Sequence, residues 1–332
     1  MPTIKDVAKH AGVSVATVSA VINRDSGVKV SKKLTEKVEK AIKEMNYRPN
    51  RIARALSRKE TQTIAYVVPT VNNTFFSQMA HLIEDKAFEK KYGVYLCNTH
   101  SMVERVELYK DILIENRVAG VITTLTWDII ENGFIEAMRE EEIPIIGLAG
   151  ARRVDGIDTI TFHDVRGGEL ATQYLLEKGH RKIGFIGIEE SKTTEQRLKG
   201  YKKALMEAKV EVDERYIERG KSFNREEGYI LAHKLYRKCP EVTAIFVYND
   251  IMAAGVLDGF NDLGLRVPGE IAVVGYDNSV ASYTRPKLTT MDLFKEKMVD
   301  EAMDILFRRI AREEFEPRHE QILPKLVVGE SS

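Results

Sequence analysis

The sequence predicts a small helical domain at the N-terminus, followed by an α/β core of two similar lobes. A glycine turn between two short amphipathic segments marks the first domain, within residues 1–48. Beyond residue 62, apolar stretches of strand length alternate with amphipathic helical stretches, and the alternation runs through two rounds. Such alternation is typical of parallel sheets flanked by helices. Charge separates the same two parts, because residues 1–60, here called the head, hold fourteen Lys and Arg against six Asp and Glu.

The head begins with two predicted helices joined by a turn at Gly12. Glycine tolerates the positive φ of a tight turn, and Ser14 can cap a helix that starts at about Val15. A preceding helix, predicted over residues 3–10, supplies the packing partner. The second helix buries Val18, Val21 and Ile22 and presents Val15, Ala16, Ser19, Ala20 and Asn23 on its other face. Such a helix-turn-helix reads DNA, although a helical hairpin that packs on the core is the alternative.

The charge distribution favours nucleic acid over the hairpin alternative. The chain is neutral overall, but the head carries a net charge of +8 and the remaining 272 residues a net charge of −8. A basic module gains most of its non-specific affinity for DNA from phosphate neutralisation. We therefore expect the head to bind DNA and the acidic core to stay away from it.

A third helix and a short basic segment complete the head. The helix is predicted from a cap at Ser31 through residues 32–45, and it ends before Pro49, which disfavours helical geometry at the preceding residue. Its apolar stripe comprises Leu34, Val38, Ala41, Ile42 and Met45. Residues 50–57 are too few to form a stable helix alone, so we expect them to fold only with a partner. Residues 58–62 form a polar linker.

The core is predicted as strands alternating with helices. The first round has strands at 63–68, 94–97, 118–123 and 144–148 and helices at 75–90 and 104–115. The second round has strands at 182–188, 243–247 and 271–276 and helices at 196–208, 225–236 and 251–263. Two lobes with a cleft between them follow. Open parallel sheets bind ligands at the carboxyl ends of their strands, so the loops that face the cleft are the candidate site.

Composition and motifs argue against several classes of protein. Cys97 and Cys239 do not form a disulfide framework or a C-x-x-C pair, and the seven His show no ligand spacing, so we expect no metal or cofactor. Motifs for phosphate binding, dinucleotide binding and a nucleophile elbow are missing, which favours binding over catalysis. Without an apolar leader or about 18 consecutive apolar residues, the chain is expected to be cytoplasmic, with no membrane partner.

Separated motifs in both parts of the chain resemble the lac and gal repressor family of bacterial transcription regulators. In the head these are Thr3–Ala8, Ala11–Ser14, Thr17–Ser19, Val21–Asn23, Asn46–Asn50 and Ala53–Leu56. In the core they are Asn249–Gly255, Val267–Pro268, Val274–Asn278 and Arg285–Thr290. Both sets follow the family's order and extend over nearly the whole chain, so the sequence is identified as a member of this family.

The resemblance implies a domain organisation and an assembly. It implies a helix-turn-helix domain over 1–48, a hinge helix and linker over 49–62, and a core similar to periplasmic binding proteins. The chain would cross between the lobes near Ile160, Thr290 and Leu323, so that 63–160 with 291–322 form one lobe and 161–290 with 323–332 the other. The family implies a homodimer on a near-palindromic operator. Tetrameric relatives carry a leucine-heptad tail that this sequence lacks, so we expect a dimer.

Family positions assign DNA-binding roles within the head. Val15, Ala16, Ser19, Ala20 and Asn23 would face the major groove, Ser14 and Thr17 would contact phosphates, and Tyr47 and Asn50 would contact the DNA backbone. In the hinge segment, Ala53 and Leu56 are further DNA-binding positions, and Leu56 would wedge into the minor groove when the segment becomes helical on DNA. Most relatives carry Arg where this chain has Ala20. We therefore expect a half-site that differs where that Arg would read guanine, with more reliance on DNA shape and on Arg24, Lys29 and Arg54.

The resemblance also places a small-molecule effector in the cleft. The candidate residues are Phe75, Phe76, Trp127, Thr193, Arg197, Phe223, Asn249 and Asp277, with Ser191 as a further one. Aromatic faces with a few polar groups are typical of sugar and nucleobase pockets. The alternatives are that the two Phe are core residues, that Arg197 is a solvated charge, that Asp277 caps a turn and that Trp127 packs between the lobes.

The class of effector follows from the polar candidates. An arginine, an aspartate and an asparagine suit a neutral polyol, so a sugar or sugar derivative is the expected effector. Purine-type relatives have an Asp-Trp pair where this chain reads Leu148–Gly150, which argues against a nucleobase. A nucleobase and a phosphorylated carrier protein docked on the first lobe remain alternatives. A cytoplasmic sugar-binding protein that does not regulate is a further one, and the basic head argues against it.

Overall fold

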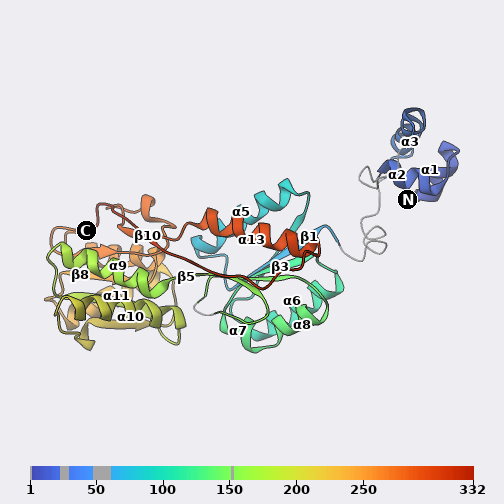
Figure 1. Cartoon of the computed structure of the whole chain (residues 1–332). Helices are drawn as coiled ribbons and strands as arrows, with labels where there is room; N and C mark the ends of the chain where they lie inside the picture. Colours follow the sequence, from blue (N-terminus) through green and yellow to red (C-terminus); the bar gives the residue numbers. More distant parts are fainter. Residues whose placement is uncertain (1, 23–29, 48–60, 151–152) are drawn as a thin grey trace. The chain divides into compact units, whose positions relative to one another are not determined.

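The computed structural model describes residues 2–22, 30–47, 61–150 and 153–332. The contacts divide the chain into a unit that ends at Thr61 and a unit that runs from Gln62 to Ser332. Each unit has its own hydrophobic core and is described by itself (Figure 1).

Within the described residues, the first unit has the helices α1 (Ile4–Ala11), α2 (Val15–Ile22) and α3 (Lys32–Glu44). Thr3 and Asp6 form a capping box at the start of α1. Gly12 has a φ of 58° and ends α1, as the turn prediction requires. The Ser14 hydroxyl oxygen accepts a hydrogen bond from the Thr17 amide at 3.1 Å and caps α2. The predicted turn, cap and start of the second helix are confirmed.

The core of this unit forms where the three helices meet. Val7, Val18 and Val38 have no exposed surface, and Ala41 is 2% exposed. Leu34, which we predicted in the apolar stripe of α3, is instead 38% exposed. It lies in the first turn of α3, beyond the reach of α1 and α2, so the stripe begins at Val38.

The first lobe of the second unit is a parallel six-stranded sheet in the order β11-β5-β4-β3-β1-β2. Its strands are β1 (Thr63–Val68), β2 (Gly93–Asn98), β3 (Gly120–Thr124), β4 (Ile145–Leu148), β5 (Asp158–Phe162) and β11 (His319–Ile322). The helices α5 (Thr74–Glu89) and α13 (Lys295–Ile310) cover one face, and α6 (Val103–Glu115), α7 (Trp127–Glu131) and α8 (Phe134–Glu140) cover the other (Figure 1). Because the sheet is covered on both faces, β1 is an almost uninterrupted apolar run.

The second lobe is a parallel four-stranded sheet in the order β7-β6-β8-β9. Its strands are β6 (Ile183–Ile188), β7 (Ile217–Gly220), β8 (Ala244–Val247) and β9 (Ala272–Val274). The helix pair α9 (Asp164–Glu177) and α10 (Lys192–Glu207) packs on this sheet, and so does the pair α11 (Arg225–Lys238) and α12 (Asp250–Asp262). Short 3₁₀ turns occur at Glu214–Tyr216 and Ala281–Tyr283.

Three segments connect the lobes. β5 leads into α9, β10 (Thr290–Asp292) precedes α13, and β11 is followed by β12 (Lys325–Val327), which pairs with β10 in antiparallel fashion. β5 remains paired with β11 as far as Phe162, two residues after Ile160, and α9 of the second lobe begins at Asp164. The other two crossings lie close to Thr290 and Leu323.

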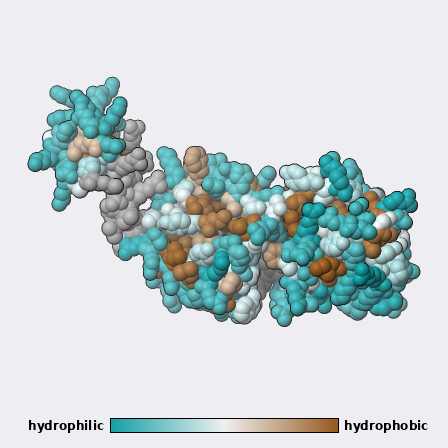
Figure 2. Space-filling view, turned by 180° about the vertical axis from the view of Figure 1, so that it is seen from behind, coloured by the Kyte–Doolittle hydropathy of each residue, from teal (hydrophilic) through white to brown (hydrophobic). Residues whose placement is uncertain are grey.

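Most predicted core elements are confirmed by the structure. The predicted helix at 196–208 instead begins at Lys192, because the Ser191 side chain caps it by accepting a hydrogen bond from the Thr194 amide at 3.2 Å. Elements without a predicted counterpart include β5, α9, α13 and β11. None of the described helices has the length and apolar character needed to cross a membrane. On the face shown in Figure 2, hydrophobic residues form separate patches within a largely hydrophilic surface.

Candidate functional site

The DNA-binding candidates of the head lie on and around α2. Val15 is 40% exposed, Ala16 is exposed, and Thr17 and Ser19 are partly buried. The Ser14 and Thr17 hydroxyls lie 2.9 Å apart and pair with each other. Tyr47 packs partly buried against the helical core. The other candidates, Asn23, Asn50, Ala53 and Leu56, lie outside the described residues, as do Arg24, Lys29 and Arg54.

Ala20 is not on the exposed face of α2, contrary to our prediction. Its side chain is 9% exposed. Successive helical residues advance by about 100°, which places Ala20 roughly 140° away from Val15, and its single methyl carbon does not reach past its neighbours. Only Thr17 and Ser19 are polar in this helix, so the apolar pattern gave little information about its two faces. The presented surface is therefore centred on Val15 and Ala16.

The effector candidates all line one cleft between the two lobes of the second unit. The cleft has a volume of about 810 Å³, within the usual range for small-molecule sites. Its lining includes every predicted residue: Phe75, Phe76, Trp127, Thr193, Arg197, Phe223, Asn249 and Asp277. Ser191 lines it as well. Residues from six separate loops and helix starts thus converge, as expected for the carboxyl ends of two parallel sheets.

Arg197 is the most strongly held charge in the cleft. It is 6% exposed, and its Nε donates to Asp164 Oδ1 at 2.8 Å. Its Nη1 donates to the Tyr248 carbonyl, and its guanidinium lies 3.6 Å from the ring centroid of Tyr276 and 4.8 Å from that of Tyr248. Burial is the largest single effect and opposes the charge on Arg197, but Asp164, Tyr276 and Tyr248 together outweigh burial and raise the pKa of Arg197. Arg197 is therefore a fixed cation rather than a solvated surface charge.

Asp164, the partner of Arg197, was not among the predicted residues. It is 4% exposed, and burial raises its pKa while Arg197 opposes the rise. It begins α9 directly after β5, and neither element was predicted. Had β5 been recognised, a carboxylate two residues after its end would have signalled a cleft position. Tyr248 also lines the cleft and directly precedes the predicted residue Asn249.

Asp277 is a buried carboxylate at the second lobe's edge of the cleft. It is 5% exposed, has a φ of 94°, and its Oδ1 accepts from the Ser279 amide at 2.9 Å. Burial raises its pKa to about 6. Burial and then the Asp277 charge also raise the pKa of Asp250, whose carboxylate accepts from the Thr290 hydroxyl at 2.6 Å. Asp277 therefore caps a turn and also lines the cleft.

Asn249 and the aromatic residues complete the lining. The Asn249 Oδ1 accepts from the Met252 amide at 2.8 Å and caps α12, and its Nδ2 donates to the Phe223 carbonyl at 3.3 Å. Phe75 is 7% exposed and meets the ring of Phe76 edge to face at 5.2 Å. Phe75 is thus both a core residue and a cleft residue. Trp127 is 68% exposed, so it does not pack between the lobes.

Two side chains of the first lobe bind the loop that carries Asp277. Gln78 Nε2, from α5, donates to the Ser279 carbonyl at 2.9 Å. Lys295 Nζ, at the start of α13, donates to the carbonyl oxygens of Asp277 and Asn278 at 2.7 and 3.1 Å. A ligand that contacts Asp277 therefore acts on a loop held by both lobes.

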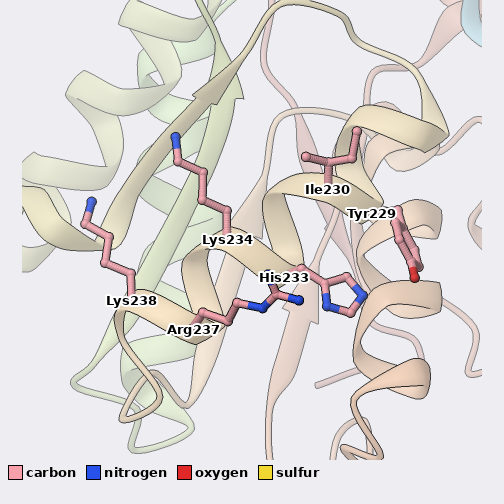
Figure 3. Close-up of a pocket in the computed structure, with 6 residues that line it drawn as sticks. All are labelled: Tyr229, Ile230, His233, Lys234, Arg237 and Lys238. Atoms are coloured by element: carbon pink, nitrogen blue, oxygen red, sulfur yellow. The ribbon is translucent and has the colours of Figure 1, made fainter.

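A second hollow, of about 720 Å³, lies on the outer surface of α11 (Figure 3). Its six lining residues, Tyr229, Ile230, His233, Lys234, Arg237 and Lys238, all come from this one helix. Lys234 and Lys238 form ion pairs with Glu218. The lining side chains in Figure 3 spread along the helix instead of converging, so this hollow does not resemble an enclosed ligand site. The described residues contain no group of side chains that could hold a metal ion.

Comparisons with known proteins match both units. A family model described as "Bacterial regulatory proteins, lacI family" matches residues 3–50, and one described as "Periplasmic binding protein-like domain" matches residues 172–332. The "HTH-type transcriptional repressor PurR" of Histophilus somni is 35% identical over 333 residues, which cover 100% of this chain and 99% of that protein. The protein of the same name from Yersinia enterocolitica is 37% identical, with 98% and 96% covered.

Solved structures match most or all of the chain. A "transcriptional regulator CelR-cellobiose complex" is 31% identical with a TM-score of 0.73, and 100% of both chains is covered. The lac repressor dimer bound to operator and the anti-inducer ONPF is 28% identical with a TM-score of 0.85, and 99% and 98% are covered. A lacI-family regulator from Enterococcus faecium with bound ribose is 27% identical with a TM-score of 0.74, and 81% of this chain and 98% of that chain are covered.

Proposed function

Because this chain belongs to the lacI family of bacterial regulatory proteins, we propose that it represses transcription as a dimer on a near-palindromic operator. We further propose that a sugar or sugar derivative in the cleft controls DNA binding. The basic head with its helix-turn-helix supports the first part, since its exposed Val15 and Ala16 can lie against base edges in a major groove. We expect it to bind without catalysis and to act in the cytoplasm, where it has access to the chromosome.

The observation that carries the choice of a sugar is the polar set buried within an aromatic cleft. Arg197 donates, Asp277 accepts and Thr193 can do either, while Phe75, Phe76 and Trp127 offer apolar faces. Sugar hydroxyls both donate and accept, and the C–H faces of a sugar ring pack on aromatic rings. Similar proteins have been solved with cellobiose and with ribose.

A nucleobase is the second candidate, because the relatives that match over nearly the full length are repressors with the name PurR. One position in the lining of the cleft argues against a nucleobase. Purine-type relatives carry an Asp-Trp pair where this chain reads Leu148–Gly150. Ala149 and Gly150 line the cleft, and a Cβ on Gly150 would lie 2.8 Å from the Leu125 carbonyl oxygen. This chain therefore offers neither the stacking ring nor the carboxylate of those relatives at that position.

The proposed control works through lobe closure. A ligand that contacts Asp277 on one lobe and Phe75 on the other favours one relative position of the lobes over another, and it shifts the equilibrium only by its difference in affinity for the two. The changed spacing of the first lobes in the dimer then permits or prevents the hinge segments from folding on DNA.

The test is a thermal-shift screen of the full chain with sugars, sugar phosphates and purines, followed by operator binding with each hit. We expect sugars to raise the melting temperature and to change operator affinity, and the Asp277→Asn variant to lose the shift. The Asp155→Asn variant is the matched control, since that side chain is 91% exposed. Stabilisation by purines alone would refute the proposal that the effector is a sugar. Ligands that stabilise the protein but leave operator binding unchanged would refute the proposal that the ligand controls DNA binding.

A further inference from the structure

The lining of the cleft falls into two sets that differ in burial. The inner set comprises Arg197, Asn249 and Asp277, with exposed fractions of 6%, 3% and 5%. The outer set is exposed and comprises Trp127 on the first lobe and Glu189, Glu190 and Lys192 on the second. Each set combines hydrogen-bonding groups with an aromatic surface, since Phe75, Phe76 and Phe223 accompany the inner polar residues. The cleft can therefore contact a ligand at two depths, one buried and one near the surface.

Trp127 is an exposed side chain next to buried residues of a short helix. It is the first residue of α7, and the two residues after it anchor that short helix: Asp128 is 3% exposed and Ile129 is 1% exposed. The Asp128 carboxylate accepts from the Thr99 hydroxyl at 3.3 Å, and its carbonyl accepts from Asn132 Nδ2 at 2.9 Å. The indole itself remains 68% exposed. The indole therefore offers an exposed aromatic face at the edge of the cleft.

The exposed rim of the cleft on the second lobe is hydrophilic. The segment Glu189–Lys192 consists of two carboxylates, a hydroxyl and an ammonium group, and three of its four residues are exposed. A sugar ring between the indole and this rim would suit both surfaces, because its C–H face packs on the indole and its hydroxyls reach the polar rim.

The size of the cleft points the same way. About 810 Å³ lies in the upper part of the range of roughly 300–1,000 Å³ for small-molecule sites. If a single sugar ring bound to the inner set, Trp127 and the rest of the outer set would contact water and not the ligand.

We propose that the effector contains at least two linked sugar rings, and that Trp127 selects for the second. The inner ring contacts Arg197, Asn249 and Asp277, and the outer ring stacks on the Trp127 indole and meets the rim formed by Glu189–Lys192. This inference rests on the proposed function, because it assumes a sugar in the cleft, and it adds chain length as the specificity of that same site.

Trp127 is the only tryptophan of the chain, so its fluorescence reports directly on the outer set. The full-length protein is titrated with cellobiose, maltose, lactose, sucrose and trehalose, with glucose, galactose and fructose, and with guanine and hypoxanthine. We expect one or more disaccharides to shift the emission to shorter wavelength and to protect the indole from acrylamide. The binding disaccharide should bind at least about tenfold more tightly than either of its component sugars.

Variants separate stacking from other effects. Trp127→Ala should weaken disaccharide binding, measured by calorimetry, by about tenfold while changing the binding of the component sugars less than about twofold. Trp127→Phe should retain most of the affinity because it keeps an aromatic face. Phe88→Ala is the control, since Phe88 belongs to the same lobe, is 80% exposed and does not line the cleft; it should bind like the parent.

The outcomes separate the proposal of a second sugar ring from the proposal that the effector is a sugar. If a component sugar binds as tightly as every disaccharide, or if Trp127→Ala leaves disaccharide affinity unchanged, the second ring is refuted while the sugar effector stands. If guanine or hypoxanthine binds and no sugar does, the sugar effector is refuted, and the second ring with it.

Discussion

Replacing Asp277 with Asn removes a buried charge from the cleft but keeps the oxygen that accepts from the Ser279 amide. Asp277 is 5% exposed, and burial is the main reason that its pKa rises from the ordinary 3.8 to about 6. Hydrogen bonds from Ser279 and the charges of Lys295 and Arg197 oppose the rise without cancelling it. The ionised carboxylate is therefore a destabilising feature of the unliganded fold.

The size of this effect follows from the linkage between protonation and folding. One pKa unit corresponds to about 1.4 kcal/mol, so the difference between 3.8 and about 6 corresponds to about 3 kcal/mol at neutral pH. Between about pH 4 and pH 6 the folded state holds a proton that the unfolded state has released, so the unfolding free energy of the parent falls as the pH rises. The Asn variant lacks this fall, and its loss of charge also relieves Asp250, whose pKa the Asp277 charge raises.

The assay is urea unfolding of both full-length proteins, followed by far-ultraviolet circular dichroism at about pH 4 and about pH 7. We expect Asp277→Asn and the parent to have equal unfolding free energies near pH 4, and the variant to be more stable by up to about 3 kcal/mol near pH 7. The same variant should bind sugar more weakly, because the acceptor that faces the cleft has lost its charge. A variant that is less stable at pH 7, or a difference that does not change with pH, would refute the reasoning; Asp155→Asn should show neither effect.

Four further predictions test other parts of the molecule. Asp164→Asn leaves the buried Arg197 guanidinium without its carboxylate and should lower the unfolding free energy by about 3–5 kcal/mol, and a loss below about 1 kcal/mol would contradict the ion pair. Gln78→Ala removes a hydrogen bond between the lobes and should change sugar affinity about fivefold by calorimetry, whereas no change would mean that the contact does not couple to binding. Ala16→Arg adds a guanidinium to the exposed surface of α2 and should shift operators selected from a random pool toward guanine at one symmetric position, and unchanged selection would contradict the assignment of this surface to the major groove. Removal of residues 1–57 should abolish operator binding and preserve sugar binding, and lost sugar binding would show that the core depends on the head.

Local signals explain why the head was predicted so closely. The Thr3–Asp6 capping box, the left-handed Gly12 and the Ser14 cap each involve groups within a few residues of one another. The sequence therefore contains all the information that sets these helix ends. Ala20 was misplaced because α2 is apolar nearly all round, so the spacing of its hydrophobic residues does not distinguish the two faces.

Lobe structure depends on contacts that no local pattern contains. β11 pairs with β5, and Thr159 is hydrogen-bonded through its hydroxyl to His319, 160 residues away. The same limit applies to the site. Arg197 matched a family position, but its partner Asp164 comes from the preceding helix, and only the close packing of α9 on α10 brings the two together. At Gly168 a Cβ would lie 2.1 Å from the Arg197 carbonyl, so a missing side chain permits that packing.

The loop that carries Asp277 is linked through packed helices to β1, the first strand of the second unit. Its carbonyl oxygens accept from Gln78 on α5 and from Lys295 on α13, and these two helices pack on each other. Both helices also cover the sheet that contains β1. The second unit begins at Gln62, and β1 begins at the next residue, Thr63. A ligand that moves the Asp277 loop must break these hydrogen bonds or carry α5 and α13 with it. Either response reaches β1 through packed elements, so Gln78→Ala should alter how strongly the sugar changes operator affinity, and an unaltered coupling would place the route elsewhere.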